Sequence, residues 1–222
     1  LFHLPVERRA TRIQEMLTRF DLTGDAESLP SSLPLGVLKA KAVAFDPPLP
    51  DDHQSNIDNL AFGTVTKLAL KFAEPFWDIE TQYFGIMTSE KGRWNYWLNY
   101  RTFSNENILL GLSVGAYAPV ADRMTDAEQI ADGMDVLRSV WGDAVTEPVQ
   151  VLSTHWATDP HSLGAYAYIR PGGRASQCDD LADPIEDRLF FCGEHTIFDY
   201  KGTIHGAYMT GLIAAEHVMD AV

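Results

Sequence analysis

The chain has 222 residues, 45% of them apolar and 22% charged, which is ordinary for a globular protein and enough to form one large domain or two small ones. Its formal net charge of −14 argues against a nucleic-acid-binding surface and suits either solubility or the attraction of a cationic substrate. No apolar run reaches the ~20 residues of a transmembrane helix, and no signal-peptide pattern opens the sequence. We therefore expect a soluble protein with no membrane partner; the cytoplasm is favoured, although the compartment itself is left open.

The first part of the chain combines a helical pattern with a short extended segment. Residues 5–20 predict an amphipathic helix, because apolar side chains recur on one face at helical spacing. Residues 31–39 predict a short strand that is interrupted by a turn at Pro34 and Gly36. The proline-rich residues 45–50 predict a crossing between two parts of the fold.

The middle of the chain alternates in the way that a sheet requires. A short helix is predicted at residues 53–60, and residues 65–72 predict a strand that places Thr66 and Leu68 on the opposite face from Lys67. Further strands are predicted at residues 83–87, 94–100 and 108–114. The aromatic side chains of the second of these can pack in the core, which is the favoured interpretation, or line an amine pocket. They are Trp94, Tyr96, Trp97 and Tyr100.

A capped helix and another strand follow. Thr125 and Glu128 have the spacing of a capping box, and Gly142 ends the helix. Residues 149–156 predict a strand, and an aromatic segment at residues 164–168 comes after a turn.

The C-terminal residues predict a ligand-binding arrangement. The apolar residues 189–192 predict a buried strand, and residues 193–196 form a polar loop. Residues 201–207 form a second loop, which opens a helix that runs to the end of the chain. A strand, a polar loop and a glycine-opened helix bring backbone N–H groups up to a phosphate, and small side chains let a flat ligand approach the backbone. The two cysteines, Cys178 and Cys192, predict neither a disulfide framework nor a metal site.

Four motifs stand out in the sequence. The longest is LFFCGEHT at residues 189–196, followed by Y-x-G-T-I-H-G-A at residues 200–207. The others are LPLGVLK at residues 33–39, FG-x-x-x-K with FW between residues 62 and 77, and W-x-x-D-P with Y-x-Y between residues 156 and 168. All four resemble motifs of the flavin-dependent amine oxidases, in particular the polyamine oxidases and the lysine-specific histone demethylases. The resemblance covers residues 29–222.

The resemblance implies an α+β or α/β fold in two parts. One part is an amine-oxidase-type substrate domain, a mixed sheet flanked by helices, and the other is the C-terminal part of a Rossmann-like FAD-binding domain. The implied limits are a helical segment at residues 1–28 that fits the substrate domain, an FAD-domain crossover strand at 29–45, a substrate-binding domain at 46–150 and a C-terminal FAD-binding segment at 151–222.

The resemblance also implies roles for individual residues. Lys67 would be catalytic, reaching the flavin N5 through a water, whereas the pattern alone suggests a solvent-facing lysine. Tyr166 and Thr203 would shape the substrate cage; without the motif Tyr166 would be a buried core tyrosine. Many polyamine and monoamine oxidases carry tyrosine where this chain has Thr203, so a more open cage is implied, one that admits a bulkier amine. The residues implied in cofactor binding are Trp156, Gly193, Glu194, Gly202, Thr203, Ile204 and Ala207. Glu194 facing a phosphate would be repelled, so a ribose hydroxyl or a backbone N–H is its expected partner.

The G-x-G-x-x-G fingerprint that receives the FAD pyrophosphate does not occur in this sequence. We therefore expect a complementary chain that carries the N-terminal Rossmann half. The reaction implied is FAD-dependent oxidation of an amine C–N bond to an imine, with O2 reduced to hydrogen peroxide. An alternative is an L-amino-acid oxidase, which needs an arginine for the substrate carboxylate; the candidates are Arg93, Arg101 and Arg170. Another alternative is a non-catalytic interaction module that has lost its nucleotide-binding half.

Overall fold

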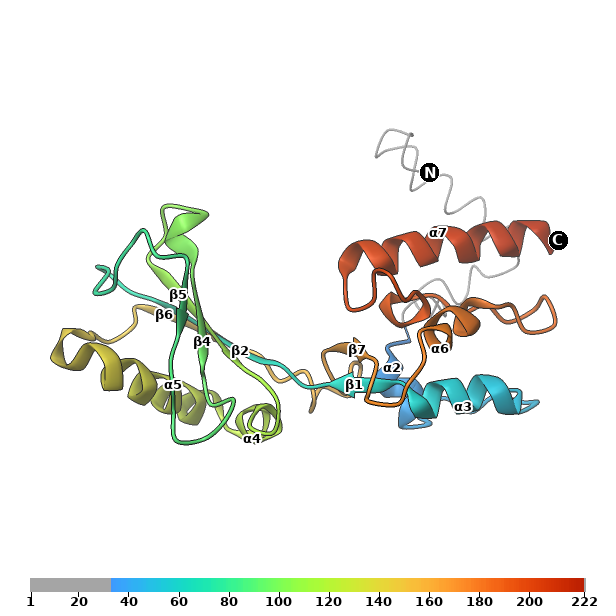
Figure 1. Ribbon diagram of the computed structural model, residues 1–222, viewed down its shortest axis with the longest axis horizontal. Coiled ribbons are helices and arrows are strands. Elements are labelled where there is room, and N and C mark those ends of the chain that lie inside the picture. Colours follow the sequence, from blue (N-terminus) through green and yellow to red (C-terminus); the bar gives the residue numbers. More distant parts are fainter. Residues whose placement is uncertain (1–32, 222) are drawn as a thin grey trace.

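The computed structural model describes residues 33–221, which form two lobes (Figure 1). The predicted helix at residues 5–20 and the rest of the 1–28 segment lie outside the described residues. One lobe is built around a five-stranded sheet, and the other around helices and a two-stranded sheet. Strand β2 and the segment that follows β6 run between the lobes (Figure 1). The expected α+β fold with a sheet flanked by helices is confirmed.

The five-stranded sheet has the order β3-β4-β5-β2-β6, and every neighbouring pair is antiparallel rather than mixed. Its strands are β2 (Thr66–Lys71), β3 (Tyr83–Gly85), β4 (Tyr96–Asn99), β5 (Ile108–Ser113) and β6 (Gln150–Ser153). The alternation predicted for β2 is confirmed, because Thr66 and Leu68 are fully buried and Lys67 is exposed on the other face. All five strands coincide with predicted ones.

Helices α4 (Ala118–Arg123) and α5 (Asp126–Trp141) pack against this sheet (Figure 1). The predicted capping box is confirmed: the Glu128 backbone N–H donates to Thr125 Oγ1 at 3.3 Å, and the Thr125 N–H donates to the Glu128 carboxylate at 2.8 Å. Trp94 and Trp97 are fully buried in the core, as the favoured interpretation requires, whereas Tyr96 and Tyr100 are exposed and do not fit it.

The second lobe contains α2 (Leu35–Lys39), α3 (Asp51–Asn59), β1 (Ala61–Gly63), β7 (Tyr166–Tyr168), α6 (Ser176–Asp179) and α7 (Ile204–Asp220). Strands β1 and β7 pair antiparallel. Short 3-10 helices complete the chain: η2 (Tyr100–Thr102), η3 (Gly142–Ala144), η4 (Asp180–Ala182) and η5 (Glu194–Thr196). Buried side chains from α2, α3, α6 and the segment before η5 form the core of this lobe, among them Leu35, Ile57, Cys178 and Phe191.

Two predicted strands are not formed. Residues 35–39 are helix α2 instead of a strand, because Leu35 and Leu38 are spaced to enter the core together and Pro34 suits a helix N-terminus. Residues 189–192 make only an isolated bridge, between Ile185 and Leu189. A β-strand requires backbone hydrogen bonds to a neighbouring strand, and none of the described strands pairs with this segment.

The domain limits predicted at residues 46 and 150 stay predictions; packing groups the elements of the two lobes as follows. Helix α3 and strand β1 pack in the second lobe, whereas β6 belongs to the five-stranded sheet. Hydrophobic contacts between residues far apart in the sequence decide which elements pack in each lobe. The assignment of either lobe to cofactor or substrate stays a prediction. Within residues 33–221, the structure contains no helix that is both long and apolar enough to span a membrane.

Candidate functional site

A cavity of about 400 Å³ is lined by residues from both lobes. A volume of this order is typical of small-molecule sites. Most of the predicted site residues line it: Lys67, Trp156, Tyr166, Gly193, Glu194 and Ala207. Apolar side chains, among them Pro34, Phe62 and Val65, complete its wall. Across the described part of the chain, no group of three or more histidine, cysteine or acidic side chains could hold a metal ion.

Lys67 is set apart from the other lysine of β2 by its surroundings. The Lys71 ammonium pairs with Glu106 at 2.5 Å. The Lys67 ammonium has no hydrogen-bond or ion-pair partner among the described residues, and it lines the cavity. Its backbone is fixed, because its N–H donates to Thr154 Oγ1 at 2.9 Å and its carbonyl accepts from the Thr154 N–H at 3.0 Å. The backbone of Lys67 is thus fixed, and none of the described carboxylates neutralises its ammonium.

Trp156 and Tyr166 supply aromatic surface to the same cavity. The exposed fractions of their side chains are 43% and 41%, so neither is a core residue. Tyr166 opens β7, and Trp156 follows the end of β6. Exposed aromatic faces beside a cavity can hold a cationic or flat ligand. The role of Tyr166 as a wall of a substrate cage stays a prediction.

Glu194 has backbone partners, as expected for a carboxylate that does not face a phosphate. Its carboxylate accepts hydrogen bonds from the Gly202 N–H at 2.7 Å and from the Ala167 N–H at 3.1 Å. Burial raises the pKa of Glu194, and these two backbone hydrogen bonds oppose that rise. Glu194 therefore ties β7 to the loop that precedes α7.

Gly202, Thr203 and Ile204 do not line the cavity. Thr203 caps α7: its hydroxyl accepts from the Gly206 N–H at 3.0 Å and donates to the Tyr200 carbonyl at 2.5 Å. A side chain at Gly206 would place its Cβ 2.3 Å from the Tyr200 carbonyl oxygen, so this glycine is required by the packing of its own loop. The ligand-binding roles of Gly202, Thr203 and Ile204 stay predictions.

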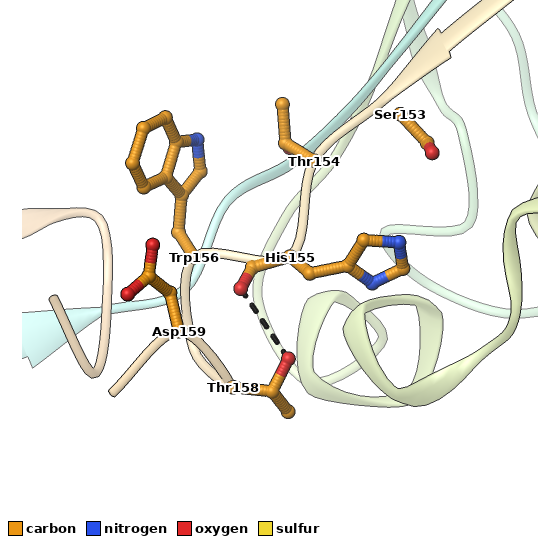
Figure 2. A pocket seen from close by; sticks show the side chains of 6 residues that line it. All are labelled: Ser153, Thr154, His155, Trp156, Thr158 and Asp159. Atoms are coloured by element: carbon orange, nitrogen blue, oxygen red, sulfur yellow. Dashed lines mark hydrogen bonds between the residues drawn. The ribbon is translucent and has the colours of Figure 1, made fainter. Parts of the chain in front are cut away.

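A second, shallower hollow of about 420 Å³ adjoins Trp156 (Figure 2). Figure 2 shows the His155 ring and the Trp156 indole pointing in opposite directions from adjacent positions. His155 Nδ1 lies 2.8 Å from the Asp122 carbonyl oxygen, and Nε2 lies 2.8 Å from the Asp126 carboxylate. The Asp122 carbonyl, together with Asp126, raises the pKa of His155. His155 therefore links the Trp156 segment to α4 and α5.

The Asp122 carboxylate holds the turn that follows Trp156. The sequence pattern did not predict this role of Asp122. Its side chain is 1% exposed and accepts from the Ala157 N–H at 3.2 Å, the Thr158 N–H at 3.0 Å and the Thr158 hydroxyl at 3.1 Å. The donors lie 35 and 36 residues away in sequence, so no local motif joins them to Asp122. In the sequence alone, this residue belongs to an acidic run that suggests a solvated face.

We expect Asp122→Ala to destabilise the folded chain by about 2 kcal/mol, because it removes the acceptor of the Ala157 N–H and one of two acceptors of the Thr158 N–H, which also donates to the His155 carbonyl at 3.3 Å. The free energy of unfolding from urea titration measures this effect. Asp143→Ala, at an exposed aspartate of η3, is the control and should change the free energy little. Equal effects of the two substitutions would show that the Asp122 contacts do not stabilise the turn.

A pH dependence of stability follows from the burial of His195. Its side chain is 2% exposed, and burial lowers its pKa from 6.5 to about 4. Since the folded pKa lies below the unfolded one, the unfolded chain binds the proton first as pH falls, and stability is lost between about pH 6.5 and pH 4. From pH 7 to pH 5 this loss amounts to about 2 kcal/mol.

Replacing His195 by phenylalanine should remove this contribution. The measured quantity is the difference in unfolding free energy between wild type and His195→Phe at pH 7 and at pH 5. His155 has a raised pKa, so its contribution to stability grows as pH falls. Because His155 is present in both proteins, its contribution cancels in the difference between wild type and His195→Phe. A difference that is independent of pH would contradict the depressed pKa.

This chain is similar in sequence to known flavin-containing proteins. The profile of the flavin containing amine oxidoreductases matches residues 25–219. Lysine-specific histone demethylase 1 homolog 3 of Arabidopsis thaliana is 37% identical over 193 residues, which cover 85% of this chain and 12% of that protein. A possible lysine-specific histone demethylase 1 of Drosophila melanogaster is 36% identical over 220 residues, covering 90% and 25%. Polyamine oxidase 5 of rice (Oryza sativa subsp. japonica) is 36% identical over 185 residues, covering 83% and 37%.

The chain therefore spans only between 12% and 37% of the length of these three curated relatives. The similarity nevertheless extends over nearly all of the described residues, including both lobes and every residue named around the cavity. The chain belongs to the flavin-containing amine oxidoreductase family.

Proposed function

We propose that the protein containing this chain binds FAD and oxidises an amine C–N bond to an imine, with O2 reduced to hydrogen peroxide. The observation that carries this proposal is the cavity at which Lys67, which pairs with none of the described carboxylates, meets the half-exposed rings of Trp156 and Tyr166. The curated relatives include proteins named polyamine oxidase and lysine-specific histone demethylase, and their names support an amine as the substrate.

The chemistry of the cavity fits a flavin ring system. Apolar side chains and two aromatic rings suit a flat heterocycle, and Lys67 suits its polar edge or a water beside it. FAD would supply the two-electron oxidation. A cavity of about 400 Å³ is smaller than a whole FAD, so the rest of the cofactor would be held elsewhere.

Four of the residues that line the cavity have a task in this proposal. Lys67 holds the water that is used at the imine or near O2, and it can pass a proton through it. Trp156 and Tyr166 orient the amine and exclude water from its reacting carbon. Glu194 keeps β7 and the loop before α7 in place, because its carboxylate is already engaged by the Ala167 and Gly202 N–H groups.

A complementary half that carries the Rossmann fingerprint is part of the proposal. Helix α7 exposes apolar side chains along its length: Ile204, Met209, Ile213 and Met219 are between 37% and 92% exposed. The segment at residues 189–192 has no ladder partner among the described strands. Both features suit a surface that packs against further protein.

The amino-acid oxidase alternative has no candidate arginine at the cavity among the described residues. Arg93 forms an ion pair with Asp132 at 2.7 Å and another with Asp135 at 2.8 Å. Arg101 donates to Asn107 at 2.5 Å, and Arg170 donates to Asn59. None of these three arginines lines the cavity. A substrate without a carboxylate is therefore the better fit.

The proposal is tested on the whole protein that contains this chain, purified with any chain that copurifies. The expected result is the absorption spectrum of oxidised FAD, which bleaches when an amine is added without oxygen, and release of hydrogen peroxide in air. The panel should contain polyamines, N-methylated lysine peptides and L-amino acids. Protein without flavin would overturn the proposal, and a response to L-amino acids alone would favour the alternative.

A further inference from the structure

His155 lies between two residues that belong to the cavity wall or are bonded to it. The preceding residue, Thr154, exchanges hydrogen bonds with the backbone of Lys67 at 2.9 and 3.0 Å, and the following residue, Trp156, lines the cavity. Figure 2 shows the His155 ring on the side of the backbone opposite to the Trp156 indole. Contacts that fix this ring therefore also fix the backbone that presents Trp156 to the cavity.

Both ring nitrogens of His155 face oxygen atoms that can only accept a hydrogen bond. Nδ1 lies 2.8 Å from the backbone carbonyl of Asp122 in α4, and Nε2 lies 2.8 Å from the carboxylate of Asp126 in the first turn of α5. The Ser153 hydroxyl donates to the same Asp126 oxygen at 2.5 Å, and this hydrogen bond, together with that from His155, lowers the pKa of Asp126. Two acceptors need two N–H donors, and the imidazolium form of histidine has both.

The other groups around the ring agree with this charge state. The Gln129 amide nitrogen lies 3.3 Å from Nδ1, but it donates to the Ala121 carbonyl at 3.0 Å, so the ring does not have to accept from it. The Asp122 carbonyl, followed by the Asp126 side chain, raises the pKa of His155, and burial opposes this rise. The charged groups that act on the ring are the carboxylates of Asp126 and Asp122, and both favour the proton. The side chain is 34% exposed, so the ring can exchange its proton with solvent.

We propose that His155 is a positioning residue for Trp156, and that it holds the Trp156 segment in full only as an imidazolium. Loss of one proton leaves one ring nitrogen with a lone pair facing an oxygen lone pair, so one of the two hydrogen bonds becomes a repulsion. The segment that carries Thr154 and Trp156 then loosens, and the cavity wall loosens with it. The effect on catalysis rests on the proposed function, whereas the effect on the segment does not.

The first measurement follows the segment itself, by hydrogen exchange of residues 153–158 in the whole protein, detected by mass spectrometry and corrected for the intrinsic effect of pH on exchange. Protection in wild type should fall roughly tenfold between about pH 6 and about pH 9, the loss expected for one hydrogen bond to a charged group. Asp126→Asn should move the midpoint of this fall to lower pH, because the carboxylate that stabilises the imidazolium is gone. His155→Gln should have the low protection at both pH values. The control His161→Gln, at an exposed histidine that does not line the cavity, should match wild type.

The second measurement tests whether the segment positions Trp156 for the reaction. The kcat/KM for the amine in wild type, divided by that in His155→Gln, should be about ten near pH 6 and approach one near pH 9. Ionisation of the amine and of Lys67 is common to both proteins and cancels in this ratio.

Two results would overturn the assignment. Protection of residues 153–158 that is independent of pH in wild type, or that falls equally in His155→Gln, would show that the proton on His155 does not hold the segment. A fall in protection with a kcat/KM ratio that stays constant with pH would show that His155 stabilises the turn without positioning Trp156. Protein that oxidises no amine would refute the proposed function, and the exchange measurement would then decide the role of His155 by itself.

Discussion

Replacing Lys67 by methionine should lower kcat/KM for the amine about a hundredfold or more, the range seen when a side chain that manages a proton is lost. Methionine keeps most of the length of the side chain and removes the ammonium, which has no counter-charge among the described residues. Since the backbone of Lys67 is held by Thr154, the strand should keep its register in the variant. The FAD content and the Tm should therefore stay close to those of wild type.

The matched control is Lys71→Met, on the same face of the same strand. Lys71 is paired with Glu106 near the far end of β2 and does not line the cavity. Steady-state kinetics with the best amine of the panel, measured in air, compares the two variants. If Lys67→Met and Lys71→Met have equal activities, the proposed part of Lys67 in the reaction is refuted.

Replacing Glu194 by alanine should destabilise the folded protein by about 3 kcal/mol. The substitution removes the charged acceptor of the Ala167 and Gly202 N–H groups, and each such hydrogen bond stabilises by about 1.5–3 kcal/mol before the cost of burying the carboxylate is counted. Urea titration at pH 7 measures the change. Glu216→Ala, at an exposed position of α7, is the control and should have little effect.

The ionisation of Glu194 adds a pH dependence. Burial raises its folded pKa above the ordinary value of 4.5, so its contribution to stability is complete below that pH and declines as pH rises through the folded pKa. Glu194→Gln cannot ionise, and its unfolding free energy relative to wild type should therefore rise over this window. If the stability of Glu194→Gln relative to wild type falls with rising pH instead, the backbone hydrogen bonds lower the pKa of Glu194 by more than burial raises it.

Local sequence patterns predict much of the sheet lobe correctly. The alternation along residues 65–72 is that of a half-buried strand, and Thr125, Glu128 and Gly142 mark the ends of α5. These signals succeed because strand alternation and helix capping depend on residues within a few positions of each other. The C-terminal motifs likewise predict the family, because they combine a specific loop with a specific helix start.

The same reasoning fails where the partner is distant. Residues 35–39 form a helix because the core of the second lobe receives Leu35 and Leu38, a contact that no local pattern states. Residues 189–192 have strand-like composition, yet pairing needs a neighbour, and none of the described strands provides one. Asp122 suggests a solvated acid until its contacts with Ala157 and Thr158 are seen.

For the candidate site, the sequence motifs were sufficient to name Lys67, Trp156, Tyr166 and Glu194 one by one. Their arrangement around one cavity, with residues from both lobes, depends on tertiary contacts between segments more than a hundred residues apart. The unpartnered Nε2 of His195 is likewise a property of packing, because burial and missing partners exist only in the folded chain. Composition and periodicity describe what each segment prefers; the free energy of burying those segments together decides which polar groups meet and which stay without a partner.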